Sequence, residues 1–110
     1  MAYDEALAER IRALFGGESD VTEKRMFGGL AFLIGGNMSV SVSGQGGLLL
    51  RCEPARTADL VQEPHASNAV MRGRAMEGWL RVDADGVQGD EELQKWVTRG
   101  VSYARSLPPK

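Results

Sequence analysis

Apolar side chains recur at helical spacing near both ends of the chain. Polar and charged residues occupy the other faces of both segments. This periodicity predicts two amphipathic helices, the first ended by the glycine pair at residues 16–17 and the second by Pro108. The apolar stripes are Tyr3, Leu7, Ile11, Leu14 and Phe15 in the first helix, and Leu93, Trp96, Val97, Gly100, Val101, Ala104 and Leu107 in the second.

Between these helices, apolar residues alternate with small or polar ones, which is typical of half-buried strands. Three strands are predicted, over residues 23–34, 38–43 and 48–52. We interpret Gly28 and Gly29 as a bulge within one long first strand. The inward-facing positions are Leu30, Phe32 and Ile34, then Met38, Val40 and Val42, then Leu48, Leu50 and Cys52.

The two segments that connect these strands, residues 35–37 and 44–46, both contain glycine and suit three-residue hairpin turns. Such turns keep the apolar side chains of neighbouring strands on one face, whereas a two-residue turn would place them opposite serine. The pairs predicted by this register are Ile34 with Met38, Phe32 with Val40, Val42 with Leu48, and Val40 with Leu50.

A further helix is predicted over residues 54–62, beginning at Pro54, and two more strands over residues 70–75 and 78–83. The order is therefore α-β(3)-α-β(2)-α. It indicates an α+β fold of two layers, in which helices cover one face of a five-stranded antiparallel sheet. Residues 1–110 are expected to form a single domain, because this length builds one hydrophobic core.

Composition places the chain among ordinary globular proteins, with 43% hydrophobic and 25% charged residues. Its apolar runs are too short to cross a membrane, its N-terminus lacks the pattern of a secretion signal, and Cys52 is its only cysteine. We therefore expect a cytoplasmic protein. The net charge of −2 gives no general attraction to nucleic acid, although residues 24–81 carry seven Lys/Arg against four Asp/Glu.

Candidate catalytic groups are few, because the chain has one histidine and one cysteine. Nucleophilic catalysis needs a positioned base and an orienting group, and a zinc site needs three or four ligands. We therefore expect His65 to anchor a loop and Cys52 to pack in the core, with no catalytic, metal or cofactor site. A small enzyme that uses Cys52 and His65 remains the alternative.

The outward-facing positions of the sheet are the more promising site. Strand alternation sends small serines and a set of larger side chains to this face. Tryptophan and arginine are the residues most often found as binding anchors. We predict a protein-binding surface here, with coverage of Trp79 by a neighbouring segment as the alternative. The proposed contact residues are Leu33, Leu49, Arg51, Trp79 and Arg81.

Four basic residues are candidates for contact with an anion: Lys24, Arg25, Arg72 and Arg74. Arginine and lysine hold phosphates. A nucleic-acid-associated transcriptional regulator is therefore an alternative, although no groove-reading helix or stacking aromatics accompany these residues.

Two sequence blocks carry a family resemblance. The segment Val-Thr-Glu-Lys-Arg-Met-Phe-Gly-Gly-Leu-Ala-Phe-Leu at residues 21–33 and the closing Ser-Leu-Pro-Pro-Lys at residues 106–110 resemble the TfoX (Sxy) N-terminal domain family. Gly36-Asn-Met38, Pro64-His-Ala66 and Gly73-Arg74 are further matching landmarks. One departure is Ala75, where family members often have proline.

The resemblance implies a fold like that of secretion-chaperone domains. Longer family members are competence regulators with a second helical domain, whereas this chain ends at Lys110 and resembles the stand-alone members. It implies a bacterial, non-enzymatic regulatory or adaptor domain that binds a protein partner or a second copy of itself.

Overall fold

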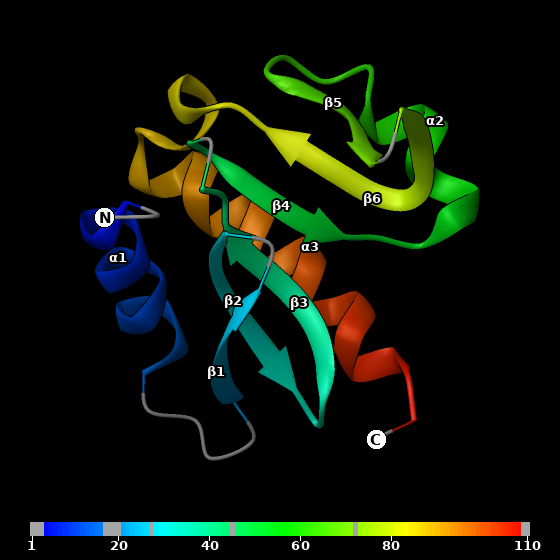
Figure 1. Cartoon of the computed structure of the whole chain (residues 1–110). Helices are drawn as coiled ribbons and strands as arrows, with labels where there is room; N and C mark the ends of the chain where they lie inside the picture. The colour runs from blue at the N-terminus through cyan, green and yellow to red at the C-terminus, as the bar shows by residue number, and fades with distance from the viewer. Residues whose placement is uncertain (1–3, 17–20, 27, 45, 72, 109–110) are drawn as a thin grey trace.

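The computed structural model describes residues 4–16, 21–26, 28–44, 46–71 and 73–108. Within them, helices lie on one side of an antiparallel sheet, which confirms the α+β fold class (Figure 1). The helices are α1 (Glu5–Phe15), α2 (Thr57–Leu60), α3 (Asp90–Ser106) and the 3₁₀ turns η1 (Pro54–Arg56) and η2 (Ala84–Val87). The strands are β1 (Val21–Met26), β2 (Gly29–Ile34), β3 (Asn37–Val42), β4 (Leu48–Arg51), β5 (Ala66–Met71) and β6 (Arg74–Val82).

The sheet has six described strands in the order β1-β2-β3-β4-β6-β5, so the prediction of five was wrong. The error lies at Gly28 and Gly29. They form a chain reversal between β1 and β2 and not a bulge in one long strand, because Met26 pairs with Gly29 and Arg25 with Leu30. Gly28 has a φ of +74°, a backbone conformation that glycine adopts without a Cβ penalty.

The register between β2, β3 and β4 was predicted with one exception. Phe32 pairs with Val40, and β3 and β4 pair as expected. However, Ile34 pairs with Asn37, not Met38, because the hairpin turn has two residues, both glycines of positive φ. A bulge at Ser39 then restores the predicted register, and the Ser39 hydroxyl donates to the Phe32 carbonyl (2.8 Å).

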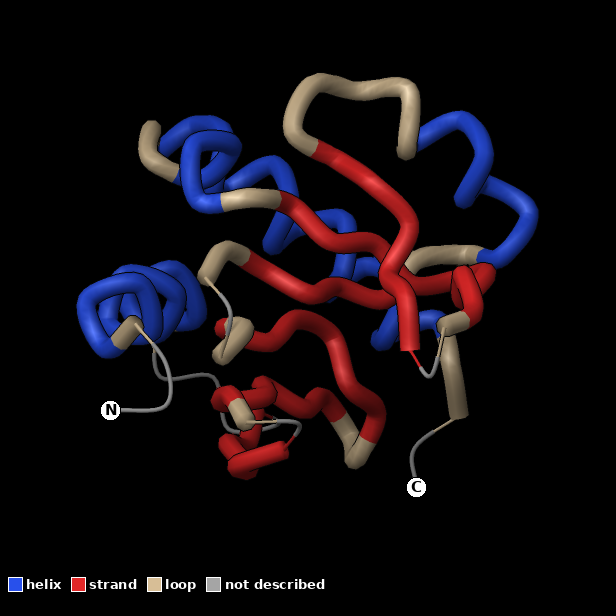
Figure 2. The backbone as a smooth tube through the Cα atoms, turned by 45° about the horizontal axis from the view of Figure 1, so that its top comes forward, coloured by secondary structure: helices blue, strands red, loops and turns tan. Residues whose placement is uncertain are grey.

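Strands β5 and β6 pair antiparallel with boundaries that differ from the prediction, since β5 ends at Met71 and β6 begins at Arg74, both inside the expected strand 70–75. Strand β6 bends at Gly78, which has a φ of +84°. Its N–H donates to the Thr57 hydroxyl (2.8 Å), and three residues of β6 have no partner in β5. Figure 2 shows the β5–β6 pair turning out of the line of the central strands.

The core lies between the sheet and the two long helices, and α3 passes behind β3 and β4 in Figure 1. Phe32, Val40, Leu50 and Leu80 form one row across the sheet and are fully buried, as predicted. Helix α3 approaches β3 closely at Gly100, where a Cβ would lie 2.6 Å from the Ser39 carbonyl oxygen. The expected helix 54–62 is shorter, made of η1 and α2.

One member of the predicted helical stripes needs correction, and one cannot be placed. Leu14 was expected to face the core but is 40% exposed, because Phe15 takes the inward position and its ring packs 5.5 Å from that of Phe32. Tyr3 lies outside the described residues. No helix within the described ranges is both long and apolar enough to cross a membrane.

Candidate functional site

The predicted contact residues lie on the outward face of three strands, β2, β4 and β6. Arg51 pairs with Trp79 and Leu49 pairs with Arg81 across β4 and β6, and paired residues share a face. Leu33 lies on the same side of β2, since its neighbour Phe32 points into the core. Figure 1 is viewed from this side, and no helix covers it. All five side chains are partly buried.

Arg51 connects this face to helix α3. Its guanidinium carbon lies 5.6 Å from the centroid of the Trp79 ring and 5.6 Å from that of Tyr103, which belongs to α3. Both distances are typical of cation–π contacts. The Arg51 side chain therefore contacts an aromatic ring of the sheet and one of α3.

Arg81 is fixed in a different way. Its guanidinium donates to the Ser43 hydroxyl (3.2 Å) and to the Gly46 carbonyl (3.2 Å), both in the connection between β3 and β4. These bonds hold the connection against β6. Arg81 therefore has a structural role in addition to the binding role predicted for it.

The centre of this face consists of short side chains that are almost fully buried, namely Ala31, Ser39 and Ser41. Short residues become inaccessible where longer ones occupy the neighbouring cross-strand positions, as Leu49 does beside Ser41. Met38 is also buried and pairs with Leu33, so it faces outward. The prediction that Met38 faces the core was wrong. The face is therefore a packed surface with a few larger side chains rising from it.

Cys52 and His65 do not form a catalytic pair. The Cys52 N–H donates to the Gly78 carbonyl, whereas the His65 carbonyl accepts from the N–H of Asp83. Gly78 lies in β6 and Asp83 directly follows it, five residues further along the extended chain, which places Cys52 and His65 about 16 Å apart.

Cys52 is 3% exposed, as predicted for a core position. Burial raises the pKa of its thiol, although the contact with the Thr57 hydroxyl and the charge of Arg56 act in the opposite direction. A thiol in this setting is a poor nucleophile.

His65 anchors a loop, as expected. Its Nδ1 lies 2.9 Å from Asp83 Oδ1, and its backbone has a φ of +69°, which is uncommon for a residue other than glycine. Among the described residues, no three acidic, histidine or cysteine side chains are grouped as a metal site would require.

The basic residues predicted to contact an anion are dispersed. Lys24 and Arg25 are exposed on β1 and alternate to opposite faces, while Arg74 is exposed on β6. Three strands separate β1 from β6, a distance of about 19 Å at the usual strand spacing. Arg72 lies outside the described residues. The structure therefore assembles no single patch from this set.

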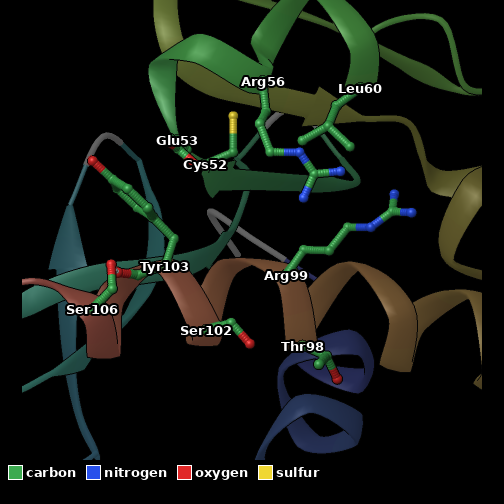
Figure 3. A pocket seen from close by; sticks show the side chains of 9 residues that line it. All are labelled: Cys52, Glu53, Arg56, Leu60, Thr98, Arg99, Ser102, Tyr103 and Ser106. Atoms are coloured by element: carbon green, nitrogen blue, oxygen red, sulfur yellow. Dashed lines mark hydrogen bonds between the residues drawn. The ribbon is translucent and has the colours of Figure 1, made fainter.

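One feature was missed by sequence reasoning: a pocket of about 360 Å³ between the η1–α2 segment and α3 (Figure 3). It includes Arg56 and Leu60 from one wall and Arg99, Ser102 and Tyr103 from the other. These residues are more than 35 positions apart in sequence and form no motif. No sequence signal could have joined them without the packing of α3 across the sheet.

The comparisons with known proteins give one match. A family model described as the TfoX N-terminal domain matches residues 11–104, so the resemblance seen in the sequence is confirmed. No curated protein and no solved structure matches the chain significantly. The predicted likeness to secretion-chaperone domains therefore stays a prediction.

Proposed function

Because the chain belongs to the TfoX N-terminal domain family, a family of competence-regulator-like domains, we propose that it is a non-enzymatic regulatory domain that acts by binding a protein partner. The family is regulatory and is not known for catalysis. The separation of Cys52 from His65 agrees with this proposal, since the pair could not share a proton.

The observation that carries the proposal is the Arg51–Trp79 pair on β4 and β6, at which Arg51 also contacts Tyr103 of α3. Arg51 lies against the Trp79 ring. Leu49, two residues before Arg51 on β4, lies on the same face and pairs with Arg81. A rigid aromatic ring and an ordered arginine lose little conformational freedom on binding, which favours affinity. The partner is expected to offer an apolar contact to Trp79 and acidic groups to the arginines.

The test is quantitative capture of proteins from cells that express the tagged chain, compared between variants. Trp79→Ala removes the ring, and Arg81→Glu reverses the charge beside Leu49. A specific partner should be lost from both variants, and self-association, measured by light scattering, should be reduced if a second copy is that partner. Leu14→Ala is the matched control, because Leu14 is an exposed apolar residue on α1.

Circular dichroism establishes that each variant is folded, which matters for Arg81 because of its bonds to the β3–β4 connection. If the folded Trp79→Ala and Arg81→Glu proteins retain the same captured proteins and the same oligomeric state as the parent chain, this surface assignment is wrong.

A further inference from the structure

The pocket between η1–α2 and α3 contains charged and polar groups that the proposed function does not use. Figure 3 shows Arg56 extending from the η1 wall toward α3, with Arg99 extending from α3 to one side of it and the Tyr103 ring to the other. Its volume, about 360 Å³, is within the range of small-molecule sites. The lining residues are Cys52, Glu53, Arg56, Leu60, Thr98, Arg99, Ser102, Tyr103 and Ser106.

The two arginines of the pocket are in different states. Arg99 is held in place, because its Nη1 lies 2.7 Å from Glu63 Oε2 and its guanidinium lies 4.8 Å from the centre of the buried Trp96 ring. Arg56 is exposed, and no described carboxylate lies within ion-pair distance of it. A guanidinium that is near a pocket and is not neutralised by a described partner is available to an anion.

The local balance of charge is positive, although the whole chain has a net charge of −2. Of the residues that line the pocket, Arg56 and Arg99 supply two positive charges and Glu53 supplies one negative charge, so the lining has a net charge of +1. An anion that enters the pocket is attracted by this excess.

The remaining lining suits an organic ligand better than a bare ion. The Tyr103 ring and the Leu60 side chain offer apolar surface, and the Ser102 and Tyr103 hydroxyls offer hydrogen bonds. The Tyr103 ring is already oriented by Arg51.

We propose that this pocket binds a small organic anion whose phosphate or carboxylate group contacts Arg56 and whose body lies against Tyr103 and Leu60. A small molecule is favoured over a protein segment because the recess has the volume of a small-molecule site, about 360 Å³. The pocket is distinct from the proposed docking face, although Arg51 contacts both Trp79 of that face and Tyr103 of the pocket.

The experiment is a titration of the ¹⁵N-labelled chain, followed by amide chemical shifts. The probes are phenyl phosphate and benzoate, with inorganic phosphate and benzyl alcohol as the comparisons that lack the body or the charge. Saturable shifts are expected at residues 53–60 and 98–106 with at least one of the two organic anions. Stronger binding of phenyl phosphate would identify phosphate as the preferred group, and stronger binding of benzoate would identify carboxylate.

Two variants locate the contact. Arg56→Gln removes the charge and should weaken binding about tenfold or more, the usual effect of losing a charge-assisted hydrogen bond. Arg25→Gln is the matched control, because Arg25 is exposed on β1, far along the sheet order from the pocket, and its affinity should equal that of the parent chain. Tyr103→Phe keeps the ring and should weaken binding only a few-fold, since one neutral hydrogen bond is lost.

Three results would overturn the proposal. One is the absence of saturable shifts in these segments with either organic anion at 20 mM, about the weakest binding that the titration resolves. Another is equal binding by the parent chain and a folded Arg56→Gln variant. The third is binding of benzyl alcohol as tight as that of benzoate, because the recess would then recognise apolar surface and not charge.

Discussion

The two faces of the sheet are built from the same strands but differ in how deeply their side chains are buried. On the face under α1 and α3, every residue of the row Phe32–Val40–Leu50–Leu80 is fully buried and apolar. On the opposite face, Leu33, Leu49 and Trp79 are only partly buried, and the arginines Arg51 and Arg81 are fixed by aromatic rings or hydrogen bonds. The difference indicates that the first face supplies most of the folding free energy, while the second can change without unfolding the chain.

The sharpest test of this difference uses two adjacent residues of β2. Phe32→Ala should lower the free energy of unfolding by about 3–5 kcal/mol, because it leaves a cavity beside Phe15 and under the helices. Leu33→Ala, one position along on the outer face, should cost about 1 kcal/mol, since this side chain is already partly exposed. Urea denaturation measures both.

Equal losses of unfolding free energy in Phe32→Ala and Leu33→Ala would contradict this difference between the faces, because both faces would then contribute equally to stability. If the Phe32→Ala variant is unfolded in the absence of urea, its loss of stability is too large to measure. Phe32→Leu, which leaves a smaller cavity, would then give a measurable value.

The contact between α3 and the sheet gives the second test. Gly100→Ala should destabilise the chain by about 1–3 kcal/mol, because the new methyl group would lie 2.6 Å from the Ser39 carbonyl oxygen and 2.8 Å from Val40 Cγ1. Helix propensity alone predicts the opposite effect, a gain in stability of about 1 kcal/mol, because alanine favours a helix more than glycine does.

Gln94→Ala on the same helix is the control for Gly100→Ala. Gln94 is exposed, so its replacement should change stability by less than about 0.5 kcal/mol. If Gly100→Ala raises the midpoint of urea denaturation, the close approach of α3 to β3 is not rigid.

The edge where the two faces meet gives the third test, at the bend of β6. Thr57→Val should cost about 1–2 kcal/mol, because it leaves the buried Gly78 N–H without its acceptor while conserving side-chain volume. Thr57→Ser retains the hydroxyl and should cost less than Thr57→Val. The reverse ranking, measured by thermal unfolding, would show that the methyl group matters more than the hydrogen bond.

Much of the core face could be predicted from the sequence, because alternation and helical periodicity are local signals. Alternation alone places Phe32, Val40, Leu50 and Leu80 on the buried face, where the structure has them. The reversal at Gly28 could not be distinguished from a bulge, since glycine serves both and the flanking residues alternate equally well in either case. The bulge at Ser39 was missed because a two-residue turn followed by a bulge gives the same Phe32–Val40 pair as a three-residue turn.

The candidate site was less predictable, since its contacts are between residues distant in sequence. Strand parity placed Arg51 and Trp79 on the same face, but nothing in the sequence indicated that they would pair or that Tyr103 would lie near the same guanidinium. The pocket at Arg56 depends on how α3 crosses the sheet and on where the short helix ends. Side-chain contacts between elements are set by packing, which periodicity does not encode.

The smallest expected effect concerns charge at the rim of the helix-covered face, where Arg12 of α1 bridges Glu23 of β1 through two bonds of 2.7 Å. The hydrogen bond from Arg12 lowers the pKa of Glu23. A carboxylate whose pKa is lower in the folded chain stabilises it above the ordinary value of 4.5, and this contribution is lost as the pH falls below that value.

Because both side chains are more than a third exposed, solvent screening limits the contribution of this pair to about 0.5 kcal/mol at pH 7. Glu23→Gln should therefore lose about that amount at pH 7 and match the parent chain at pH 3, with Glu77→Gln, an exposed glutamate on β6, as the control. Added salt should shrink the difference at pH 7. A loss above 2 kcal/mol, or one that persists at pH 3, would mean that charge at the rim rivals apolar burial in holding the helices to the sheet.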